Sequence, residues 1–161
     1  MSTLSQSTGK GTRQTWVKWL IATLALAAIA FLSSPSGPLG SFWRPSPDVP
    51  PPAGAQLLLF LLLNVAEALA FGMGVSFLVF GYPAVQRVLP RAKGLAFAAY
   101  LSIVWLLANW WPHDSLHIAN GTNVGGLLAI EYAFHVTLIV AGAILATFFL
   151  ALARRQASLS Q

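Results

Sequence analysis

The chain has no cysteine, and only 8% of its 161 residues are charged. The absence of cysteine excludes disulfide bonds, thiolate metal ligands, iron–sulfur clusters and a cysteine nucleophile. Soluble domains carry about 25% charged residues, whereas this chain is 57% hydrophobic. It also lacks a phosphate-binding glycine loop, a hydrolase elbow and a kinase signature. The composition therefore predicts a protein whose main solvent is lipid.

Four apolar runs reach or approach the roughly 20 residues needed to cross a bilayer. They predict an all-α, polytopic membrane protein in which four transmembrane helices form one bundle. The first run has the basic flank of a signal peptide, but no clean A-x-A cleavage site follows it, so we favour a retained helix. The membrane domain is expected to cover residues 16–155, with helices at about 16–32, 56–82, 94–111 and 126–153.

The segments outside these runs are polar or rich in proline. Residues 33–55 hold most of the ten prolines. Proline removes a backbone donor and fixes φ, so this segment is expected to form an extended outward loop. Residues 112–125, PHDSLHIANGTNVG, are expected to form a second outward loop, whose Asn-Gly pair is a turn signal. Residues 1–15 and 156–161 are predicted to be cytoplasmic tails, the first of them disordered.

The basic residues predict the orientation. An excess of Lys and Arg marks the cytoplasmic side. With four crossings, both termini are therefore expected in the cytoplasm, and both long loops outside the cell or in the periplasm, at a plasma (bacterial inner) membrane. The basic residues flank helix ends and form no basic helix face, so the net charge of +5 does not indicate a nucleic-acid partner. The residues on the basic side are Lys10, Arg13, Lys18, Arg87, Arg91, Lys93, Arg154 and Arg155, and Arg44 is the exception.

The histidines and acidic residues have the opposite distribution. The chain has only three histidines and four Asp or Glu residues. All of them fall in or near the outer half of the predicted bundle. The positive-inside rule places no demand on these residue types. Their gathering in one region therefore predicts a polar functional site.

Two pairs of residues in this region have the spacing of one helical turn. Glu131 and His135 form one pair, and His113 and His117 form the other. Side chains with this spacing share a face and can hold a metal ion, so all four are predicted ligands. Zinc, copper and iron all accept His with carboxylate. Haem ranks behind them, because paired axial histidines are awkward in a loop. The structural alternative is a Glu–His hydrogen bond beside solvated histidines, with Asp114 as a helix cap.

Glu67 lies about three turns into the second helix, near mid-membrane at 1.5 Å per residue. An ionised carboxylate at that depth costs at least about 2.5 kcal/mol, so it must be neutral, paired or facing a wet cavity. Glu67 is predicted as a further metal ligand or a proton carrier, and the alternative is a protonated hydrogen-bonding group. Asn64, Asn109 and Asp114 are predicted to hydrogen-bond the ligand side chains without binding the ion themselves.

Three functions fit these residues. The first is a membrane protein that binds a transition metal, as an accessory or redox-related subunit. The second is a non-catalytic structural or assembly subunit of a larger membrane complex, with membrane-protein partners or a second copy of the chain beside it in the lipid bilayer. The third is a proton or ion pathway that uses Glu67. No motif identifies a reaction or a substrate, so the sequence does not decide whether the protein is an enzyme.

Overall fold

The computed structural model describes residues 8–159, and the side chains of residues 16–158. All regular elements in this range are helical, which confirms the all-α prediction. The short element η1 is a 3₁₀-helix, and η2 is a π-helical turn inside the last long helix. In chain order the elements are α1 (Thr8–Ser33), η1 (Gly40–Trp43), α2 (Ala55–Phe80), α3 (Tyr82–Val88), α4 (Lys93–Ala108), α5 (Trp110–Asn120), α6 (Val124–Glu131), η2 (Tyr132–Val136) and α7 (Thr137–Leu159).

Three helices are long and apolar enough to cross a membrane. They are Trp16–Ser33 within α1, the whole of α2, and Val124–Ser158, which joins α6, η2 and most of α7. A fourth crossing results if α4 and α5, which meet at a bend of 46°, act as one span. α1 begins at Thr8, so residues 8–15 of the expected tail are helical, and residues 1–7 lie outside the described residues. The chain therefore has the helices of a membrane protein, with three or four candidate spans.

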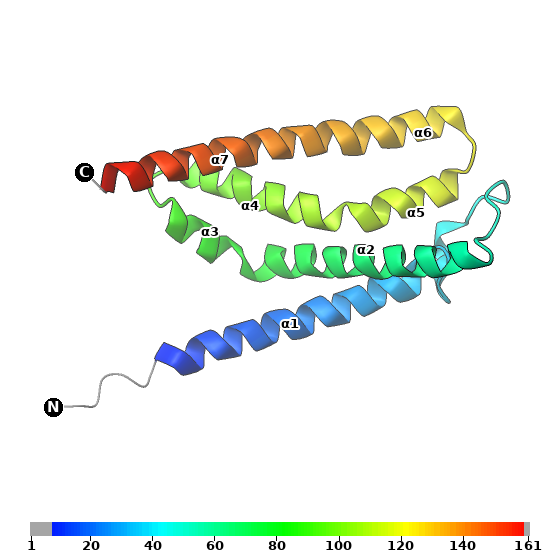
Figure 1. Ribbon diagram of the computed structural model, residues 1–161, viewed down its shortest axis with the longest axis horizontal. Helices are drawn as coiled ribbons and strands as arrows, with labels where there is room; N and C mark the ends of the chain where they lie inside the picture. The colour runs from blue at the N-terminus through cyan, green and yellow to red at the C-terminus, as the bar shows by residue number, and fades with distance from the viewer. Residues whose placement is uncertain (1–7, 160–161) are drawn as a thin grey trace.

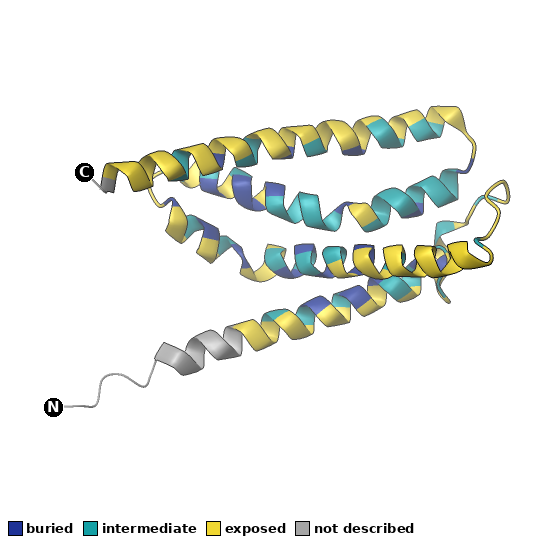
Figure 2. Ribbon diagram, viewed as in Figure 1, coloured by how far each residue is buried: buried dark blue, intermediate teal, exposed yellow. Residues whose placement is uncertain are grey.

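The long helices, which were expected to form one four-helix bundle, lie side by side in an open row. In Figure 1 the order across the molecule is α1, then α2, then α4 with α5, then α7 with α6. The contacts agree, because α1 packs mainly on α2, α2 on α4, and α4 on α7. Lipid tails are as apolar as leucine, so helices in lipid gain little by closing round a core. Figure 2 accordingly shows exposed residues along the outer sides of α1 and α7.

Two glycines of α2 allow the neighbouring helices to approach closely. A Cβ atom on Gly72 would lie 2.9 Å from the backbone nitrogen of Ala27 in α1. A Cβ atom on Gly74 would lie 2.8 Å from the backbone nitrogen of Ala108 in α4. Both distances are shorter than van der Waals contact. Small residues thus join α2 to the helix on either side, as is usual between helices in lipid.

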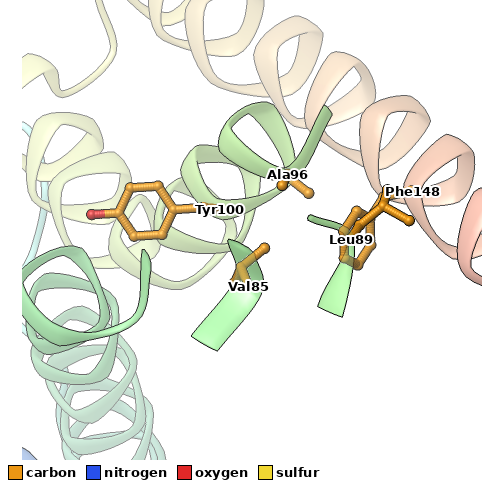
Figure 3. Packing of buried hydrophobic residues seen from close by; sticks show 6 residues of the cluster. Val85, Leu89, Ala96, Tyr100 and Phe148 are labelled. Atoms are coloured by element: carbon orange, nitrogen blue, oxygen red, sulfur yellow. The ribbon is translucent and has the colours of Figure 1, made fainter. Parts of the chain in front are cut away.

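The main cluster of buried apolar side chains lies where α3, α4 and α7 meet. Val85 and Leu89 pack with Ala96, Tyr100 and Phe148 (Figure 3). The cluster joins the consecutive helices α3 and α4 to α7, which follows much later in the chain. It therefore holds these helices together at the ends that lie away from the histidines.

The basic residues gather at one end of the long helices, and the histidines and acidic residues gather at the other. The start of α1, the α3–α4 connection and the end of α7 lie at one end in Figure 1. They carry Lys18, Arg87, Arg91, Lys93, Arg154 and Arg155. Lys10 and Arg13, which were expected on the same side, lie outside the described side chains. The opposite end holds η1, the Pro-rich loop, α5 and α6. The separation of charge is therefore present in the fold, and the choice of the cytoplasmic side stays a prediction.

The stretch that was expected to be the second outward loop is mostly helical. Pro112 falls in the first turn of α5. Proline is tolerated there, because the first N–H groups of a helix have no partner within it. The chain turns at Gly121, which has a φ of 60°. The Asn123 side chain then caps α6 by accepting a 3.1 Å hydrogen bond from the backbone N–H of Gly126. The predicted Asn-Gly turn therefore returns the chain onto α5.

Candidate metal centre

Two histidines on α5 face each other across one helical turn. The Nε2 atoms of His113 and His117 lie 3.2 Å apart, and their ring centroids lie 4.6 Å apart. This contact arises because α5 is helical here, so residues i and i+4 share a face. The close pair of histidines that the i, i+4 spacing predicted therefore lies on a helical turn over PHDSLH.

Glu131 connects this pair to the following helix. It is the last residue of α6, and its two carboxylate oxygens contact different histidines. Oε1 lies 3.1 Å from Nε2 of His117, and Oε2 lies 2.6 Å from Nδ1 of His135. The ring of His135, in η2, has its centroid 5.4 Å from that of His113. All three histidines of the chain thus gather round one glutamate.

The donor atoms are spaced as the ligands of one metal ion require. One ligand atom from each of His113, Glu131 and His135 lies within 4.8 Å of the other two. Ligands at about 2.0–2.1 Å from a tetrahedral ion are about 3.4 Å apart. The contacts of His117 with Glu131 and His113, at 3.1 and 3.2 Å, are close to this spacing. Two imidazoles and a carboxylate could therefore hold one ion, with the third imidazole, that of His117, in contact with two of them, and zinc, copper and iron all accept such donors.

The group is buried on one side and open on the other. The side chain of His113 is 13% exposed, whereas that of His135 is 53% exposed. Oδ1 of Asp114 lies 3.2 Å from Nδ1 of His113. A carboxylate in this position fixes the tautomer of a ligand histidine and leaves Nε2 free to bind. An ion can thus enter beside His135, while His113 is held from behind by the carboxylate that the sequence had assigned to this task.

A π-helical turn sets the direction of His135. Phe134, on the buried side of η2, stacks on Trp105 with ring centroids 5.6 Å apart. The Thr137 hydroxyl lies 2.6 Å from the carbonyl oxygen of Ala133 and 2.9 Å from that of Phe134. The same hydroxyl accepts a 3.0 Å hydrogen bond from Nε1 of Trp105. Turns of this kind are frequent at functional sites, and here α4 holds the turn in place through Trp105.

The residues that support this turn were not predicted as part of the site. A straight α-helix would place Thr137 about 200° from His135, so the two would not act together. A π-turn changes the residues per turn, and no local sequence pattern marks it. In the sequence Trp105 is one of three tryptophans between residues 105 and 111, and nothing distinguishes it from the other two.

Replacing Thr137 by valine is expected to weaken zinc binding about tenfold, because groups that orient a ligand typically contribute 10- to 100-fold to metal affinity. Valine keeps the branched shape and removes the hydroxyl that joins Trp105 to η2. Competition with a fluorescent zinc chelator measures the affinity. The matched control is Thr147→Val, because the Thr147 hydroxyl makes only a local 2.9 Å hydrogen bond to the carbonyl of Ala143. Equal affinities for both variants would show that the Thr137 hydroxyl does not position His135.

Glu67 lies apart from this group of donors. It is 9% exposed and lines a cavity with Asn64 and Asp114. The group that can surround one ion does not include it.

Asn64 accepts a 2.7 Å hydrogen bond from the hydroxyl of Ser34. Asn109 is buried at the bend between α4 and α5, where its amide has no partner among the described residues. The structure therefore brings together four of the five predicted ligands, namely His113, His117, Glu131 and His135. Of the three predicted supporting residues, only Asp114 contacts one of these four, His113.

No family model, no curated protein and no solved structure matches the chain. Its class is defined by the fold and the site. The chain is a helical protein with three or four helices apolar enough to cross a membrane, and it carries a His–Glu–His group that could hold a metal ion.

Proposed function

We propose that this protein holds a transition metal ion at the surface of a membrane. The observation that carries the proposal is the convergence of His113, Glu131 and His135, whose ligand atoms lie within 4.8 Å of one another. α5 supplies the first of these residues, and the other two come from α6 and η2 beyond a turn. Local sequence spacing alone does not bring them together.

The facing nitrogen atoms of the histidines favour a cation. The Nε2 atoms of His113 and His117 face each other at 3.2 Å. Two facing imidazole nitrogens cannot both carry a proton, so at least one presents a lone pair. The carboxylate of Glu131, which contacts two histidines, adds negative charge at the same point. A metal ion satisfies the lone pair and the carboxylate together, which hydrogen bonds among these side chains do only in part.

The length of the last helix supports a position at the membrane surface. The 24 residues from Glu131 to Arg154 span about 34 Å, at a rise of 1.5 Å between one residue and the next. The hydrocarbon core of a bilayer is about 30 Å thick. With Arg154 at one interface, Glu131 and the histidines reach the other, where ions arrive from water. By the positive-inside rule this is the outer or periplasmic face of a plasma membrane.

The donor set narrows the ligand to zinc, copper or iron, because magnesium and calcium prefer oxygen ligands. Haem is disfavoured as a paired ligation, since His113 and His117 lie on one helix with their rings in edge contact. Such rings leave no space for a porphyrin between them. The exposure of His135 favours exchange of the ion with a partner, as in an accessory or redox-related subunit that receives or supplies a metal.

Metal analysis of the purified full-length protein tests the proposal. After loading and dialysis, the wild type is expected to hold close to one zinc, copper or iron ion per chain. His113→Ala combined with His135→Ala is expected to lower this to roughly a tenth or less, because it removes two donors from one site. Asp48→Asn, at an acid that hydrogen-bonds Thr122 and lies outside the group of donors, is the control. A wild type that retains none of the three metals, or a double variant that retains as much as the wild type, contradicts the proposal.

A further inference from the structure

A second polar site lies behind the metal group, between the Pro-rich loop, α2 and α5. Its inner part has a volume of about 50 Å³, and its polar lining includes Asn64, Glu67 and Asp114. Its outer part has a volume of about 300 Å³ and includes Phe60, Asp114 and Ile118 in its lining. Phe60, Asp114 and Ile118 line both parts, so the two adjoin. Small-molecule sites in proteins are typically about 300–1,000 Å³, so the combined cavity is large enough for a small ligand.

The inner end carries two carboxyl groups. Glu67 is 9% exposed, and its carboxyl group has that of Asp114 as a hydrogen-bonding neighbour. Over the described part of the chain, all ion pairs of acidic side chains are with histidine, so no Lys or Arg compensates Glu67. Buried acidic groups are usually paired with a cation or a donor. A positive charge beside the two carboxyl groups would compensate both of them, in a place where water screens it weakly.

The side of the cavity that α2 forms is largely apolar. Leu57 and Leu61 line the inner part and are 47% and 42% exposed on α2, which is a candidate membrane span. The Phe60 ring stands where the inner and outer parts join, and an aromatic face attracts a cation within about 6 Å. The cavity thus combines two carboxyl groups with an apolar side on a candidate membrane span.

We propose that this cavity binds the ammonium group of a small lipophilic amine beside the carboxyl groups of Glu67 and Asp114, with its apolar substituent against Phe60 and Ile118. The two carboxyl groups select the charge, and the apolar side selects the substituent. The site adjoins the metal centre, because His117 lines its outer part and Asp114 also contacts His113, but Glu67 and Phe60 are not among the donors that gather there.

Calorimetric titration of the full-length protein in phosphatidylcholine nanodiscs tests this site, with empty nanodiscs as the blank. Hexylamine is expected to bind about tenfold more tightly than hexanol, which has the same chain without the charge. Glu67→Gln keeps the size of the side chain and is expected to abolish this preference. Asp48→Asn, at an exposed acid that does not line the cavity, is expected to keep it. Phe60→Ala lies on the lipid-facing surface and is expected to weaken hexylamine binding about threefold or more.

The outcomes separate the possibilities cleanly. Equal binding of hexylamine and hexanol by the wild type, or an unchanged preference in Glu67→Gln, overturns the proposal. If Glu67→Gln does not fold, unchanged hexylamine binding by Phe60→Ala overturns it instead. Replacing part of the phosphatidylcholine by phosphatidylethanolamine identifies the source of the amine. Weaker hexylamine binding in that lipid supports the site with a lipid headgroup as its ligand, and unchanged binding supports it with a free amine.

Discussion

Replacing Glu131 by glutamine is expected to weaken zinc binding by about a hundredfold or more, because even residues behind the ligands contribute 10- to 100-fold. Both carboxylate oxygens of Glu131 are in use, one toward His117 and one toward His135. Glutamine keeps the size of the side chain but has one acceptor oxygen and no charge. Competition with a fluorescent zinc chelator measures the change.

The matched control for this variant is Glu67→Gln. The sequence predicted Glu67 as a ligand as well, but the structure places it in the separate cavity with Asn64. Its replacement is therefore expected to change zinc affinity by less than about threefold, a change of under 1 kcal/mol. A large loss in Glu67→Gln together with a small loss in Glu131→Gln would mean that the ion binds in the cavity, and not at the histidines.

Replacing Gly74 by leucine is expected to lower the free energy of unfolding by about 1–3 kcal/mol, the usual result of overpacking. A Cβ atom at this position would lie 2.8 Å from the backbone nitrogen of Ala108 and 2.9 Å from its Cβ atom. Backbone atoms cannot move aside as the end of a flexible side chain can, so α4 must shift away from α2. α5 follows Ala108 after one residue, so zinc affinity is expected to fall too.

Gly142→Leu is the matched control for Gly74→Leu. Both glycines lie inside long helices, and leucine has the higher helix propensity at both positions. Nothing lies within 4 Å of a Cβ atom on Gly142. Thermal unfolding in lipid nanodiscs compares the two variants, and Gly142→Leu is expected to unfold at or above the wild-type temperature. Equal unfolding temperatures for both variants would show that the α2–α4 contact does not depend on Gly74.

Apolar length was enough to predict the long apolar helices, and the i, i+4 spacing was enough to predict two close pairs of polar side chains. Glu131 and His135, and His113 and His117, pair as the spacing indicated, because each pair lies on one helical stretch. The meeting of the two pairs could not be predicted, because it depends on how the turn at Gly121 places α6 on α5. Glu67 shows the opposite case. Its chemistry suited a ligand, but its position on α2 directs it into the cavity with Asp114.

Two features of the fold had no signal in the sequence. The third helix was expected to end before Pro112, whereas Pro112 lies in the first turn of α5, which begins at Trp110 after a bend of 46°. A proline fits either arrangement, because it can follow the end of one helix or lie in the first turn of the next. The order of the helices in an open row could not be predicted either, since an apolar surface that faces lipid and one that faces another helix have the same composition.

The open row has a consequence for the way in which the chain is made. Each long helix has the preceding one as its main neighbour, so α2 rests on α1, α4 on α2 and α7 on α4. A nascent chain can dock every helix as it emerges from the ribosome, without waiting for a later one. The histidines of α5 are then in place early, whereas Glu131 and His135 arrive with the final helix. The candidate metal group is complete only when Glu131 and His135 have joined α5, so a bound ion would fasten α5 to the helix that follows it.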